Sequence, residues 1–173
     1  MNRHLRCAVV AVIATLIGCT PNRAPSITSQ RANDVIRRGH VDEMVTLILE
    51  YVDKSGGTLP FENRATEQPF MVFIGLTEAH EDEMAAVPAL KRGARWGNST
   101  ELEAELSRVL KRRVVLPRDP QRFATFAPNV YLYFVTGRTF CAVAHLSERS
   151  DISEPYEWTG GRFHSHARCL EPT

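Results

Sequence analysis

The sequence predicts an α+β domain that has a mostly antiparallel sheet of about four to five strands and two main helices. Two segments have helical periodicity, several short runs are rich in β-branched and aromatic residues, and a hairpin signal lies near the carboxyl end. The predicted order is helix, strand, helix, strand and then three strands. This order is typical of an α+β domain, because an α/β sheet would need regular alternation.

The first eighteen residues have the layout of an export signal. A basic head with Arg3 and Arg6 precedes an uncharged apolar run of twelve residues, from Cys7 to Gly18. A helix that crosses a bilayer needs about 20 apolar residues, whereas the apolar part of a secretory signal needs about 7 to 15. The length of the run therefore predicts a cleaved signal.

The end of this run resembles the lipobox of bacterial lipoproteins, on the residues Leu16, Ile17, Gly18 and Cys19. The resemblance implies that lipid is added to the thiol of Cys19. It also implies that a dedicated signal peptidase cuts after Gly18 and that the new amino terminus is acylated, as with palmitate. An ordinary secretory protein or an uncleaved amino-terminal anchor is the alternative.

These features predict three parts: a lipoprotein signal peptide over residues 1–18, a tether over 19–29 and one domain over 30–173. Pro21 and Pro25 fit an extended tether. The protein would lie on the periplasmic side of the cell envelope, held by membrane lipid. Thr20 stands where an aspartate would indicate inner-membrane retention, so the outer membrane is favoured.

The charge balance gives no support for nucleic-acid binding. Removing residues 1–18 leaves 173 − 18 = 155 residues, enough for one domain with its own core. It also removes two of the 21 basic residues, so 19 face 20 acidic ones and the net charge is about −1. We expect no cofactor.

The mature chain keeps two cysteines, Cys141 and Cys169, because Cys7 leaves with the signal and Cys19 takes lipid. In an oxidising compartment such a pair predicts one disulfide bond. A thiol nucleophile or a metal ligand is the alternative.

Two helices are predicted from the spacing of apolar residues. The first spans about 31–54, ends at Gly56 and Gly57, and is open to a break at Gly39. Its apolar positions are Val35, Ile36, Val41, Met44, Val45, Ile48, Tyr51 and Val52. The second starts at Thr100, where Thr100 and Glu103 fit a capping box, and ends in a short basic run.

Strands are predicted at Phe70–Leu76, at Val114–Leu116, twice within Val130–Leu146, and at Arg162–Leu170. Gly137 and Arg138 form the predicted two-residue loop of a type II′ hairpin. This loop pairs Phe134 with Cys141 and Leu132 with Val143.

The hairpin register sorts side chains onto two faces. One face would hold both cysteines and is taken as the inner face. Tyr131 and Tyr133 lie on the other, together with a basic side of the last strand made of Arg162, His164, His166 and Arg168. Aromatic and arginine residues are enriched at interfaces, so this surface is the candidate partner-binding site. The alternative is that helices cover this face, which would put the tyrosines in the core and leave the basic groups at an edge.

The pair His164 and His166 is also a candidate metal site, because two imidazoles on one strand face can chelate Zn²⁺ or Cu²⁺. His145 would be the third ligand, but its register places it on the cysteine face. Trp158 lies in the long acidic segment from Ser147 to Gly161, which is expected to be a loop. It is a further candidate binding residue, or else a side chain that packs onto the core.

No motif for nucleophilic, phosphate-binding or zinc-protease chemistry is present, so an enzyme is the less favoured interpretation. The sequence favours a lipid-anchored envelope protein that acts by binding. Its role would be an accessory or inhibitor-type partner of a membrane-associated assembly. The alternatives are a periplasmic metal-binding protein and a hydrolase with a nonstandard site.

Overall fold

A computed structural model describes residues 27–63, 68–75, 95–121, 130–147, 154–158 and 161–172. Its elements are α1 (Ile27–Ser55), β1 (Phe70–Ile74), β2 (Arg95–Asn98), α4 (Ser99–Leu110), β3 (Tyr131–Thr136), β4 (Thr139–Leu146), β5 (Glu154–Trp158) and β6 (Gly161–Leu170).

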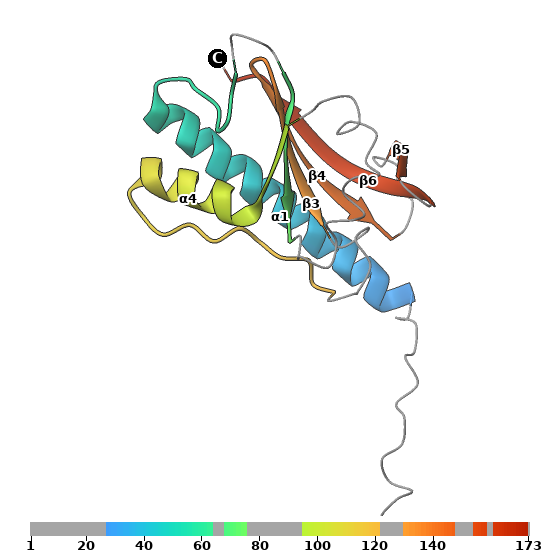
Figure 1. Ribbon diagram of the computed structural model, residues 1–173. Coiled ribbons are helices and arrows are strands. Elements are labelled where there is room, and N and C mark those ends of the chain that lie inside the picture. The colour runs from blue at the N-terminus through green and yellow to red at the C-terminus, as the bar shows by residue number, and fades with distance from the viewer. Residues whose placement is uncertain are drawn as a thin grey trace, which may run out of the picture.

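The strands form one sheet in the order β2-β1-β3-β4-β6-β5. Only the pair β1 and β2 is parallel, and every other neighbouring pair is antiparallel. Both helices lie on the same face of the sheet (Figure 1). The predicted α+β fold with a mostly antiparallel sheet and two helices is therefore confirmed.

The set of strands differs from the prediction at three places. β2 was not expected, and β5 lies in the segment from Ser147 to Gly161 that was expected as a loop. Residues Val114–Leu116 are not a strand. They run beside α4 instead, because their backbone N–H groups donate hydrogen bonds to side chains of that helix. The N–H of Val114 donates to Ser107 at 2.9 Å, and the N–H of Leu116 donates to Glu103 at 2.9 Å.

Helix α1 is continuous, so Gly39, which left the prediction open to a break, does not interrupt it. It begins at Ile27, three residues before the predicted start of the domain. It ends where predicted: Gly56 and Gly57 have φ of 73° and 88°, and the N–H of Gly57 donates to the carbonyl of Val52 at 2.9 Å. Glycine permits this left-handed exit because it has no Cβ.

Helix α4 is capped two residues earlier than predicted. Asn98 is the N-cap, and its side chain accepts from the N–H of Glu101 at 3.2 Å. The carboxylate of Glu101 accepts in return from the N–H of Asn98 at 3.0 Å. This is a capping box of the expected type. Thr100 therefore lies inside the helix rather than at its start.

The β3–β4 hairpin has the predicted register, with Phe134 opposite Cys141 and Leu132 opposite Val143. Gly137 has φ of 53°, as the first central residue of a type II′ turn requires. A local turn with one position of positive φ is sufficient to set this pairing.

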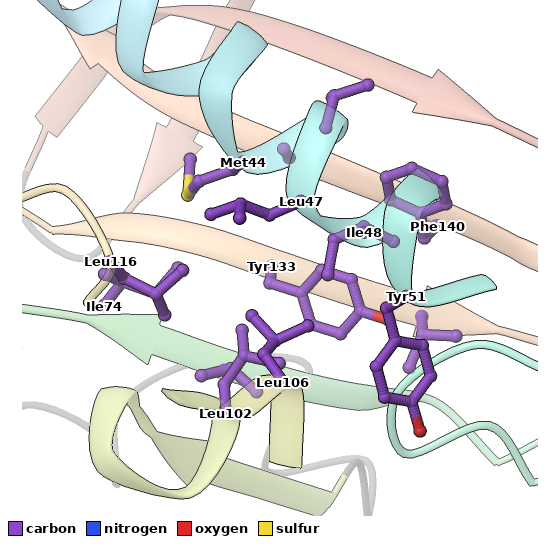
Figure 2. Packing of buried hydrophobic residues seen from close by; sticks show 14 of the residues in the cluster. Met44, Leu47, Ile48, Tyr51, Ile74, Leu102, Leu106, Leu116, Tyr133 and Phe140 are labelled. Carbon is purple, nitrogen blue, oxygen red and sulfur yellow. The ribbon is translucent and has the colours of Figure 1, made fainter. Parts of the chain in front are cut away.

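The two faces of the sheet are reversed relative to the prediction. The tyrosine face, not the cysteine face, is covered by the helices. Figure 2 shows Tyr133 and Phe140 of the sheet packed against Ile48 of α1 and Leu106 of α4. The main core therefore lies between the sheet and the helices.

Candidate functional site

The disulfide between Cys141 and Cys169 is present and joins directly opposed residues of β4 and β6. This confirms the predicted bond. It lies on the sheet face away from the helices, where Cys141 is half-buried and Cys169 is exposed. The bond fixes β6 to the centre of the sheet.

The basic side of β6 lies on the helix-covered face. His164, His166 and Arg168 are opposite Leu146, Ala144 and Ala142, which are buried beneath α1. β6 lies beyond β4 in the sheet, so its polar side chains reach the flank of α1. The guanidinium of Arg168 donates to the carboxylate of Asp42 on α1 at 2.7 Å, and both groups are exposed.

A second arginine, Arg38 of α1, faces the same side. Burial lowers the pKa of His166, and the positive charges of Arg38 and Arg168 lower it further, against the opposite effect of Asp42. Within the described residues, Nε of Arg38 and Nδ1 of His164 are buried without a hydrogen-bond partner. We call these residues the α1–β6 flank: Arg38, Asp42, His164, His166 and Arg168.

Tyr131 and Tyr133 are not part of this surface, and their prediction as binding residues is corrected. Both side chains are buried beneath the helices. The hydroxyl of Tyr131 lies 2.7 Å from Nδ1 of His40, and the hydroxyl of Tyr133 donates to the carbonyl of Pro60 at 2.9 Å. Burial raises the pKa of both phenols. They hold α1 and the chain after it onto the sheet.

The predicted metal pair shares one face of β6, but His145 lies on the opposite face, where it is paired with Ser165. In the part of the chain that the structure describes, no group of three or more histidine, cysteine, aspartate or glutamate residues could hold a metal ion. His164 and His166 therefore receive no third ligand from those residues.

Arg162 and Trp158 take places in the sheet, opposite Glu157 and Gly161 on the pair β5 and β6. The prediction that their side chains bind a partner lies outside what the structure describes. So do the predicted signal over residues 1–18, Cys19 and the tether up to residue 26. No helix among the described residues is long and apolar enough to span a bilayer.

A buried ionic cluster around Arg37 was missed by the sequence analysis. Arg37 is fully buried, and its five N–H groups make five hydrogen bonds. Asp119 accepts two of them at 2.7 and 3.1 Å, and the others go to Asp34, Ser147 and Gln121 at 2.9, 2.8 and 3.0 Å.

This cluster joins three separate segments. Asp34 and Arg37 belong to α1, Asp119 follows α4, and Ser147 follows β4, where its N–H also donates to Asp34 at 2.9 and 3.1 Å. Burial alone would lower the pKa of Arg37, but Asp119 and Asp34 outweigh it, so the pKa is raised. The arginine stays charged and holds the amino-terminal half of α1 in place.

His145 is affected by the same cluster. Burial, together with the charge of Arg37, lowers its pKa to about 4. The imidazole ring of His145 is therefore neutral at pH 7, and it lies buried near the end of β4.

A sequence signal for the cluster did exist. Asp34 and Arg37 stand at helical spacing before Val41 and Met44, which places them on the buried side of α1. Two charged residues on a buried helix face require charged or hydrogen-bonding partners. The identity of those partners, which come from 82 or more residues away, was not readable.

No protein-family model, curated protein or solved structure matches the chain.

Proposed function

We propose that this chain is a lipid-anchored envelope protein that acts by binding, as an accessory or inhibitor-type partner of a membrane-associated assembly. Lipid on Cys19 would hold it to the outer membrane with the domain on the periplasmic side. The observation that carries the binding proposal is the composition of the α1–β6 flank. His164, His166 and Arg168 of β6 lie beside Arg38 of α1, and the flank contains one acidic residue, Asp42.

The flank is held rigidly from both sides, which supports a role in binding. The disulfide between Cys141 and Cys169 fixes β6 to β4, and the Arg37 cluster fixes the amino-terminal half of α1. Preorganised side chains lose less conformational entropy when a partner binds.

The chemistry of the flank suits an acidic segment of a protein. Arg168 is paired with Asp42 in an exposed ion pair, and such pairs stabilise a protein by about 0 to 1 kcal/mol. A carboxylate of a partner can therefore replace Asp42 at little cost.

The test is a charge reversal at Arg168 with a matched control at Arg112. Both are exposed arginines, 44% and 51%, that pair with an acidic residue of α1, but Arg112 lies away from the flank. We expect Arg168→Glu to reduce recovery of crosslinked envelope partners at least tenfold and Arg112→Glu to leave it unchanged. Equal recovery with both variants would contradict the proposal.

Binding of an acidic partner should also depend on pH. His166 has a lowered pKa, so it gains its positive charge only below its ordinary value of 6.5. Binding should therefore strengthen as the pH falls below about 6.5. Titration of the wild type and of His166→Gln by calorimetry checks this, and an unchanged pH dependence in the variant would contradict the role of His166.

The metal-binding protein and the hydrolase remain predictions from the sequence. Metal content of the purified, tag-free protein separates the first of these from the binding proposal, because His164 and His166 would then retain Zn²⁺ or Cu²⁺.

A further inference from the structure

The extended segment that follows α4 is bonded to both helices. Its backbone N–H groups donate to side chains of α4, and Figure 1 shows it returning along that helix toward α1. Near the start of the segment, the guanidinium of Arg112 pairs with Glu50 of α1. Near its end, Asp119 accepts from Arg37 of α1 at 2.7 Å. The segment therefore runs beside α1 over the stretch between Glu50 and Arg37.

Two side chains of the segment point outward. Val114 and Leu116 are buried, whereas Arg113 is exposed and Val115 is 57% exposed. This alternation is expected of an extended chain, because successive side chains point to opposite sides. The outer side of the segment therefore presents one cationic and one apolar side chain.

A row of side chains on α1 borders the segment. Ile36, Glu43 and Glu50 are spaced seven residues apart, which is close to two turns of a helix, so they lie in line. The row faces the segment because Glu50 is bonded to it. Ile36 is 42% exposed, and Glu43 is also exposed. We call the four residues Ile36, Glu43, Arg113 and Val115 the α1–α4 strip.

The two charges of the strip have no partner within the described residues. The arginines on either side of it, Arg112 and Arg118, are paired with carboxylates of α1 and α4. In contrast, the side chains of Glu43 and Arg113 make no hydrogen bond or ion pair with any described group. The strip therefore presents one free negative and one free positive charge beside two exposed apolar side chains.

We propose that the α1–α4 strip is the contact surface between two copies of this chain related by a twofold axis. In such an interface, when one residue contacts a second residue of the other copy, the reverse contact is also made. An axis midway between Glu43 and Arg113 places the carboxylate of each copy against the guanidinium of the other. The Val115 side chains of the two copies then pack together close to the axis.

Charge complementarity favours a second copy over a partner of one sign. A purely acidic partner would be repelled by Glu43 and a purely basic one by Arg113, and like charges brought together in an interface are strongly unfavourable. A second copy neutralises both charges at once. Only this occupant leaves neither charge of the strip unpaired.

The dimer contact goes beyond the proposed binding at the α1–β6 flank, because the two surfaces share no residue. Asp42 of the flank and Glu43 of the strip are consecutive on α1, so their side chains point about 100° apart around the helix. The flank therefore stays available to a partner while the strip is occupied.

The test reverses the two charges in turn. Two copies of the full-length protein with different affinity tags are produced in the same cells and solubilised from the envelope in detergent. The amount of the second copy recovered with the first is measured. We expect Glu43→Arg in both copies, or Arg113→Glu in both copies, to reduce this recovery about tenfold, because both contacts across the axis then join like charges.

A mixed pair should restore the recovery. When one copy carries Glu43→Arg and the other carries Arg113→Glu, each contact again joins a positive and a negative side chain, so recovery should return to within about twofold of the wild type. A loss that arose from misfolding would not be rescued in this way, because each copy would keep its own defect. Thermal melting of each variant checks the fold independently.

Asp53→Arg in both copies is the matched control. It makes the same change of charge at another exposed acidic residue of α1, and it lies about 80° around the helix from Glu43. We expect it to leave the recovery unchanged.

Wild-type copies that do not recover each other would overturn the inference. So would single variants that recover as much as the wild type, a mixed pair that stays as low as the single variants, or a loss from Asp53→Arg as large as that from Glu43→Arg. Each of these outcomes would show that the α1–α4 strip does not join two copies.

Discussion

At the scale of single residues, the most consequential one is Arg37. A buried charge is tolerated only when hydrogen bonds replace the water it has lost. All five N–H groups of Arg37 have acceptors, and two of those acceptors are the buried carboxylates of Asp34 and Asp119. Losing the guanidinium would leave two negative charges buried without their cation.

We therefore expect Arg37→Ala to lower the free energy of unfolding by about 3 to 5 kcal/mol. Arg108→Ala is the control, because Arg108 is 65% exposed and pairs with Glu105, and exposed ion pairs contribute little to stability. Urea unfolding of both variants measures the difference. Similar losses in the two would show that the cluster does not hold the fold together.

His145 makes stability depend on pH. Its pKa in the folded protein is about 4, below the ordinary value of 6.5. As the pH falls below 6.5, the unfolded chain takes up a proton that the folded protein refuses until about pH 4. The stability contributed by the neutral ring is thus complete above pH 6.5 and is lost toward pH 4.

The expected loss is about 3 kcal/mol, from 1.36 kcal/mol for each unit of pKa difference. In His145→Gln, the free energy of unfolding should change correspondingly less between pH 6.5 and pH 4. Denaturant titrations at several pH values measure this. A variant that loses as much stability as the wild type over that range would show that His145 is not the responsible group.

At the scale of secondary structure elements, the sequence predicted that turns and helix caps occur more reliably than it predicted the residues at which they lie. The β3–β4 turn at Gly137 and the end of α1 at Gly56 were both predicted, because each depends on a glycine with positive φ. The start of α4 was placed two residues late. Both Asn98 with Glu101 and Thr100 with Glu103 fit the spacing of a capping box, and the sequence alone does not choose between them.

Mutation of Asn98 and of Thr100 tests which of the two residues caps α4. Asn98→Ala removes the side-chain acceptor of the cap and should lower the free energy of unfolding by about 1 kcal/mol. Thr100→Ala should have an effect within about 0.5 kcal/mol, because Thr100 is an exposed residue inside the helix. Thermal or urea unfolding of both variants provides the comparison, and a larger loss from Thr100→Ala would contradict the observed cap.

The inner face of the hairpin could not be predicted in the same way. Leu132 and Phe134 make one face as apolar as Tyr131 and Tyr133 make the other. The choice depends on where α1 lies, which is a long-range property. The same reason explains why Val35 and Ile36, which have helical spacing, are nevertheless exposed: the sheet covers α1 on the side of Asp34 and Arg37 instead.

At the scale of the whole molecule, the fold class was predictable and the assembly of distant segments was not. The basic side of β6 was correctly assigned to the tyrosine face, because strand alternation decides it. Its contact with Asp42 of α1 joins residues 126 apart, and no local pattern indicates such a contact. The candidate flank was therefore predicted in its β6 residues and missed in its α1 residues.

The disulfide acts at this scale, because it closes a loop over a sequence separation of 28 between two neighbouring strands. By the chain-entropy estimate, the double variant Cys141→Ser, Cys169→Ser should lose about 3 to 4 kcal/mol of unfolding free energy. Wild type under reducing conditions should behave like the variant. A loss below about 1 kcal/mol would show that the other strand contacts hold β6 without the bond.

We propose that the domain acts from a lipid anchor at Cys19, and mass spectrometry of the protein extracted from cell envelopes tests this proposal. We expect an amino-terminal peptide that begins at Cys19 and carries the mass of the added acyl chains, and we expect Cys19→Ala to lack both the cut after Gly18 and the lipid. A chain that retains residues 1–18, or that begins at an unmodified Cys19, would contradict the proposed anchor.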